Sequence, residues 1–107
     1  MATDYPIRSD RSPTWRADID SLSFRPDGHG GICMVHRHAF RTLLKRTASP
    51  EDCAAFFQQH EAAFQAAARA KIVRAKLDQG ANLHLTSRDV SRQITNGGRV
   101  PAQSPLI

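Results

Sequence analysis

The stretch after Pro50 limits the fold most, because it contains neither glycine nor proline until Gly80 and is rich in alanine. Such a sequence propagates a helix well. Ser49 is a favoured N-cap and Pro50 a favoured first helical residue, and the two acids that follow suit the positive end of the helix dipole. We therefore expect one long helix from Ser49 to about Asp78, which would be the main packing element of the fold.

One face of this expected helix is apolar. At about 100° per residue, one stripe contains Cys53, Phe57, Phe64, Ala68, Ile72 and Ala75. Phe57 and Phe64 should pack against a sheet, and the many alanines indicate close approach to a sheet or to a partner helix. His60 lies close to this stripe. We expect it to be partly buried and hydrogen-bonded to backbone, with a functional role as the alternative.

Short segments on either side read as strands. Leu22 and Phe24 alternate with polar residues in Ser21–Arg25, and Ile32–Val35 is apolar. The proline- and glycine-rich residues between them predict a reversal, so the two segments should form a hairpin. A short helix is expected over His36–Arg46 and a third strand over Asn82–Thr86. The predicted fold class is α+β, with a small, mostly antiparallel sheet of about three strands packed on one long and one short helix.

The chain has 107 residues, enough for one domain. Residues 1–17 read as an irregular lead-in, attached to the body by Trp15. Residues 18–94 form the expected domain. Residues 95–107 read as a disordered tail, after at most one helical turn that begins near Ser87.

No apolar run is long enough to span a membrane, and the N-terminus lacks the apolar core of a secretory signal. We therefore expect a cytoplasmic protein. Cys33 and Cys53 are too few and too far apart for a disulfide framework, and their spacing matches no zinc motif. They should be two buried, inert thiols.

The charge is uneven: the net charge is +5 and the pI about 10.0. Residues 37–46 and 69–76 each contain basic residues and no acidic one. These segments could form an anion-binding patch or two solvated helix faces. The candidate contacts to nucleic acid or another anion are Arg37, Arg41, Lys45, Arg69, Arg74 and Lys76.

No motif for catalysis, a cofactor or a metal is evident. His36 and His38 are two residues apart, but the predicted strand gives way to helix there, and no acid lies nearby to complete a site. The glycines after Pro26 precede a strand and lack the Lys-Ser/Thr of a phosphate loop. A Ser-His-Asp or Cys-His arrangement stays open on sequence alone. We predict no catalytic, cofactor-binding or metal-binding residue, and no enzymatic activity.

Three groups of core residues resemble a small bacterial family, domain of unknown function family 1488. The first is Leu22-Ser23-Phe24 before a glycine-containing turn. The second is Cys33-Met34-Val35 followed by Ala39-Phe40. The third is a helix led by phenylalanine, with Phe57, Phe64, Ala68 and Ile72.

Leu83-His84-Leu85 and Asp89 fit the end of the family pattern, so the resemblance covers about residues 18–90. The family usually has a basic residue near the position where this chain has Glu61. At this position the chain departs from the family pattern. The resemblance implies an α+β fold and no known activity.

Two functions follow as hypotheses. The leading one is a small bacterial accessory or interaction protein with a protein partner and no small-molecule substrate. The alternative is a non-specific nucleic-acid-binding module that uses the basic segments. The nucleic-acid-binding hypothesis requires the two basic segments, residues 37–46 and 69–76, to lie on one face of the protein.

Overall fold

The computed structural model describes residues 13–99 of the chain, with side chains as far as Thr95. In chain order the elements are β1 (Thr14–Arg16), a 3-10 turn η1 (Ala17–Ile19), β2 (Ser21–Phe24), β3 (Cys33–His36), α2 (Arg37–Leu44), α3 (Pro50–Gln59), α4 (Glu61–Ala75), β4 (Leu83–Leu85) and α5 (Ser87–Arg99). The fold is α+β, as predicted.

The sheet has four strands in the order β1-β2-β3-β4, and it is mixed. β2 forms the predicted antiparallel hairpin with β3, whereas β4 pairs with β3 in parallel. The prediction of a mostly antiparallel sheet of about three strands therefore holds only in part: β1–β2 and β2–β3 pair antiparallel, but the sheet has four strands and the pairing of β4 is parallel. Alternation of apolar residues reveals a strand but not its direction. The direction of β4 follows from the crossover through α2, α3 and α4, which returns the chain to the sheet edge running the same way.

The strand β1 lies inside the segment that was expected to be irregular. Trp15 pairs with Leu22 of β2, and Ser23 Oγ donates to the Thr14 carbonyl at 3.2 Å. The expectation of irregular structure is wrong for residues 14–16, because three residues next to a proline are too short to show alternation. Residues 1–12 lie outside the described part of the chain. Trp15 does pack against the core, as predicted.

The expected long helix is two helices, which meet at His60. Its start is confirmed: Ser49 Oγ accepts from the Asp52 N–H and Asp52 accepts from the Ser49 N–H, each at 3.0 Å. At His60 the backbone leaves the helical region, with φ −122° and ψ 30°. No glycine or proline marks this break. The His60 ring is half-buried against Phe56, with ring centroids 4.5 Å apart.

The break lets both helices pack on one aromatic cluster. Phe24 of β2 lies 4.9 Å from Phe57 of α3, and Phe57 lies 5.0 Å from Phe64 of α4, between ring centroids. Phe57 and Phe64 are fully buried, as predicted. Ile72 is only half-buried and Ala75 is exposed, because α4 ends there and the chain leaves the core.

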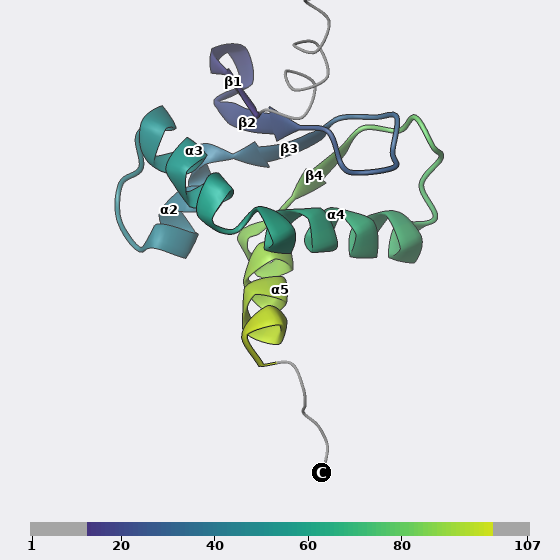
Figure 1. The fold of residues 1–107 in the computed structure, drawn as a ribbon. Coiled ribbons are helices and arrows are strands. Elements are labelled where there is room, and N and C mark those ends of the chain that lie inside the picture. Colours follow the sequence, from purple (N-terminus) through teal and green to yellow (C-terminus); the bar gives the residue numbers. More distant parts are fainter. Residues whose placement is uncertain (1–12, 100–107) are drawn as a thin grey trace, which may run out of the picture.

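The four helices share one core with the sheet. Leu22, Val35 and Leu85 of the sheet join Phe40 of α2 and Val90 of α5 in it. Figure 1 shows α4 running beneath the sheet and α5 extending away from it.

α5 is much longer than the single turn expected from the sequence, and it continues to Arg99 through the predicted start of the tail. Val90 is fully buried and Ile94 packs against the core, so two apolar residues four positions apart hold the helix down. The rest of the predicted tail, from residue 100, lies outside the described residues. No described helix is long and apolar enough to cross a membrane.

Candidate interaction surface

Arg37, the first of the predicted anion contacts, is engaged within the fold. Its Nε and Nη2 donate to Asp20 Oδ1 at 2.9 and 2.6 Å, and Nη1 donates to the Ala48 carbonyl at 3.2 Å. Its guanidinium carbon lies 5.5 Å from the centroid of the Trp15 ring. The hydrogen bonds from Arg37 lower the pKa of Asp20. Arg37 thus ties α2 to the segment that carries β1.

Arg41 and Lys45 lie together at the exposed C-terminal end of α2. With His38 and Arg46 they line a shallow hollow of about 410 Å³. Lys45 ends the helix in the left-handed region, with φ 61°, and its N–H donates to the Arg41 carbonyl. Arg46 bonds Asp52 at 3.2 Å, so part of the positive charge is already neutralised.

The remaining predicted contacts lie on α4 or at its end. Arg69 and Arg74 are exposed on α4, and Lys76 caps the helix with φ 53°. α2 and the C-terminal end of α4 lie at opposite ends of the molecule (Figure 1). The structure therefore brings Arg41 and Lys45 together but does not place them beside Arg74 and Lys76.

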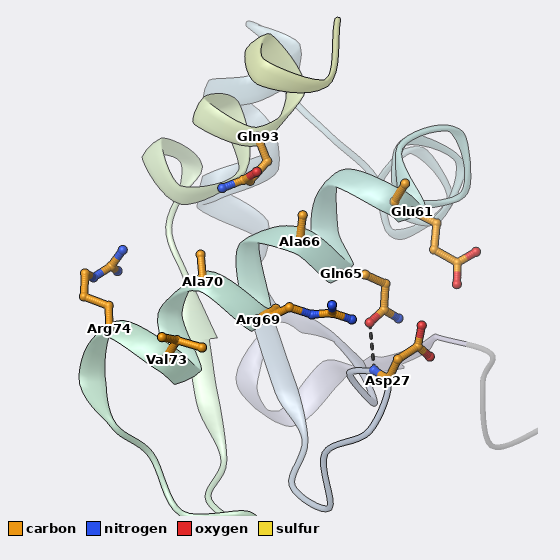
Figure 2. A pocket seen from close by; sticks show the side chains of 10 residues that line it. Asp27, Glu61, Gln65, Ala66, Arg69, Ala70, Val73, Arg74 and Gln93 are labelled. Carbon is orange, nitrogen blue, oxygen red and sulfur yellow. Dashed lines mark hydrogen bonds between the residues drawn. The ribbon is translucent and has the colours of Figure 1, made fainter. Parts of the chain in front are cut away.

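A shallow groove of about 950 Å³ runs along the outer side of α4 (Figure 2). Its floor consists of Ala62, Ala66, Ala70 and Val73, which recur at helical spacing. Val73 is 70% exposed, which makes it the most exposed large apolar side chain described. The opposite face of α4 carries buried Phe64 into the core. α4 is thus apolar on two faces: the core covers one, and the other is partly open, with Ala62 and Val73 exposed and Ala66 and Ala70 half-buried.

Charged side chains stand along this groove. Glu61 lies at the N-terminal end of α4, Arg69 farther along and Arg74 near the C-terminal end (Figure 2). Within the described part of the chain, neither Glu61 nor Arg69 makes a side-chain hydrogen bond or ion pair. Arg74 Nη2 lies 3.7 Å from Asp89 Oδ1 of α5.

One wall of the groove is the turn between β2 and β3. The Asp27 N–H donates to Gln65 Oε1 at 2.8 Å, as Figure 2 shows. The turn is also tied to the loop before β4, because His29 Nε2 lies 2.7 Å from the Ala81 carbonyl oxygen and the Gly30 N–H donates to the Gln79 carbonyl at 2.8 Å. The contacts of Asp27 and His29 join residues 38 and 52 positions apart, so sequence spacing did not reveal them.

The other wall is α5, which contributes Gln93 (Figure 2). Asp89 holds this helix against α4: its carboxylate accepts from the Thr86 N–H at 2.9 Å and lies 3.5 Å from Lys71 Nζ. Burial would raise the pKa of Asp89, but hydrogen bonds from Thr86 and the charge of Lys71 outweigh it, so the pKa lies below its usual value.

The described residues show no metal-binding cluster and no reactive thiol. The described residues contain no group of three or more His, Cys, Asp or Glu side chains that could hold a metal ion. Burial raises the pKa of the Cys33 thiol to about 12 and that of Cys53 to about 11. Both cysteines are buried and free, so they stay protonated near neutral pH.

No family model, curated protein or solved structure matches the chain. The resemblance to family 1488 therefore stays a prediction.

The groove was not identified from the sequence, although the signal is present there. Ala62, Ala66 and Ala70 lie on the face of the helix that faces away from Phe64, and the alanine content already indicated close approach to a partner. What the sequence leaves open is which alanines the core covers.

Proposed function

We propose that this chain is a small bacterial cytoplasmic interaction protein, which acts by association with a protein partner through the α4–α5 groove and not by catalysis. The resemblance to family 1488 is consistent with such an accessory role.

The observation that carries this proposal is the second apolar face of α4, which the fold covers only in part. Ala62, Ala66, Ala70 and Val73 form a continuous floor, and the charged side chains stand at its edges and ends. An apolar centre with a polar rim is the anatomy of a protein interface. A shallow groove floored by alanine offers no enclosed pocket with convergent polar groups, which a small-molecule site would need.

A photoreactive amino acid placed at position 62 of the full chain, in the native cells, tests the proposal. We expect a cross-linked protein whose attachment maps to the groove and which is lost when Ala66→Glu is added. The matched control carries the photoreactive residue at position 55, an exposed alanine of α3. If position 62 yields no product beyond that of position 55, the groove is not an interface.

A second candidate function is non-specific nucleic-acid binding, favoured by the cluster of Arg41 and Lys45 beside His38. Because α2 and the end of α4 lie apart, we place the contact at α2 alone. Each phosphate contact contributes about −0.9 to the slope of log affinity against log salt on duplex DNA.

Titration of labelled duplex at two salt concentrations tests this candidate. Replacing both Arg41 and Lys45 by Ala should weaken binding to every sequence alike and reduce the salt slope by about 1.8. Replacing Arg74 and Lys76 is the matched control and should leave the slope unchanged. Absence of binding at low salt would eliminate this function.

A further inference from the structure

We propose that α5 binds duplex DNA by lying in the major groove, with its exposed face toward the base pairs. This exposed face consists of Arg88, Ser91, Arg92 and Thr95, all of which are exposed. It is a different surface from the α4–α5 groove, so the inference goes beyond the proposed function. It also differs from the second candidate function, which places nucleic acid on α2.

The exposed face is one continuous strip of the helix. At about 100° per residue, its four residues fall within an arc of about 100°. Val90 and Ile94, which pack in the core, and Gln93, which lines the α4–α5 groove, lie outside this arc. The fold therefore holds α5 by its apolar residues and leaves a polar strip accessible along its length.

The exposed face carries positive charge that no described residue neutralises. The side chains of Arg88 and Arg92 make no hydrogen bond or ion pair within the described part of the chain. Asp89 is the one acidic residue in the sequence of α5, and it lies toward α4, 3.5 Å from Lys71 Nζ and 3.7 Å from Arg74 Nη2. With a net charge of +5 on the chain, this face is complementary to a polyanion.

The shape of α5 fits a groove of B-DNA. An α-helix with its side chains is about 10–12 Å across, and the major groove is about 12 Å wide. From Arg88 to Thr95 the exposed face is about 10 Å long, which corresponds to about three base pairs. Figure 1 shows α5 projecting from the body beyond α4, and a projecting helix can enter a groove that a flat surface cannot.

The side chains on this face favour duplex DNA over other nucleic acids. Arginine donates two hydrogen bonds to O6 and N7 of guanine, and serine or threonine hydroxyls bond to base edges in the same groove. The major groove of A-form RNA is too narrow for side chains to read. Single strands are bound mainly by stacking on aromatic side chains, and the exposed face has none.

Fluorescence anisotropy of a labelled duplex, titrated with the full chain at low and at physiological salt, tests the inference. We expect duplex DNA to bind more tightly than duplex RNA of the same sequence. Ser91→Glu should weaken DNA binding about tenfold, because its carboxylate faces the phosphates. The matched control Gln93→Glu adds the same charge to the side of α5 that lines the α4–α5 groove, and it should stay close to the parent. Circular dichroism of both variants verifies that they are folded.

A second comparison separates position from net charge. Arg88 and Arg69 are both exposed, and replacing either by Ala lowers the net charge by one. Arg88→Ala should weaken DNA binding about tenfold, because it removes a contact in the groove, whereas Arg69→Ala should have little effect. Methylation of guanine N7, which lies in the major groove, should also weaken binding by the parent.

Three results would overturn the inference: no binding to duplex DNA at low salt, equal effects of Ser91→Glu and Gln93→Glu, or binding to duplex RNA or anionic lipid vesicles as tight as binding to DNA. Binding that weakens when Arg41 and Lys45 are replaced, but not in Arg88→Ala, would place the DNA on α2 and refute the role of α5. The cross-linking experiment at position 62 is independent of these outcomes, because it probes the α4–α5 groove.

Discussion

At the scale of single residues, the aromatic cluster holds the sheet and the helices together. Phe57 and Phe64 are fully buried and contact each other and Phe24. Replacing either by Ala should cost about 3–5 kcal/mol, because it removes a large apolar side chain and leaves a cavity. The free energy of unfolding, measured in urea, checks this prediction. A melting temperature within a few degrees of the parent would contradict it.

Gly31 meets a steric demand that the sequence did not reveal. A Cβ at this position would lie 2.1 Å from the Ala81 carbonyl oxygen, whereas a Cβ at Gly80 would meet nothing within 4 Å. Gly31→Ala should cost about 1–3 kcal/mol, because backbone must move. Gly80→Ala is the matched control and should leave the stability almost unchanged. Chemical denaturation measures the stability of both variants. Equal stability of Gly31→Ala and Gly80→Ala would contradict the close approach of Gly31 to the Ala81 carbonyl.

The two thiols should resist modification. Burial raises the pKa of Cys33 to about 12 and of Cys53 to about 11, so the reactive thiolate is scarce in the folded protein. A thiol reagent added at mildly alkaline pH should label both only after denaturant unfolds the chain. Rapid labelling of the native protein would show that these side chains are reached by solvent.

At the scale of elements, the junction of α4 and α5 should depend on pH through Asp89. Its folded pKa lies below the unfolded value of about 3.9, so the stability it contributes is present above that pH and is lost as pH falls through the folded pKa. Asp89→Asn should lower stability at neutral pH and reduce the loss on acidification.

Urea unfolding of the parent and of Asp89→Asn at neutral pH and near pH 3 measures this difference. Some acid sensitivity should remain in the variant, since the pKa values of Asp20 and Asp52 are lowered too. An identical pH dependence in both proteins would show that Asp89 does not stabilise the junction.

At the scale of the whole molecule, β1 belongs to the folded unit. A chain that starts at Asp18, close to the expected domain boundary, lacks the strand that pairs with β2 and loses Trp15. It should be less stable by about 1–3 kcal/mol than a chain that starts at Pro13, mainly through lost apolar burial. Thermal unfolding of the two chains tests this. Equal melting temperatures would show that β1 does not contribute to the stability of the fold.

The sequence by itself determined the local elements. Ser49 and Asp52 specify the start of α3, the alternation of Leu22 and Phe24 specifies β2, and Phe57 and Phe64 are core residues in any packing. Each of these signals acts within a few residues, through capping, pleating or side-chain periodicity.

Only the tertiary structure decided the remaining features, because each of them depends on contacts between segments that are distant in the chain. The break at His60 carries no local signal and follows from packing two helices on Phe24. The direction of β4 depends on the crossover, and the role of Arg37 depends on Asp20 and Trp15. The groove depends on which face of an alanine-rich helix the core covers. Alanine is compatible with either face, so only the placement of Phe64 against the sheet leaves Ala62 exposed and Ala66 and Ala70 half-buried in the groove.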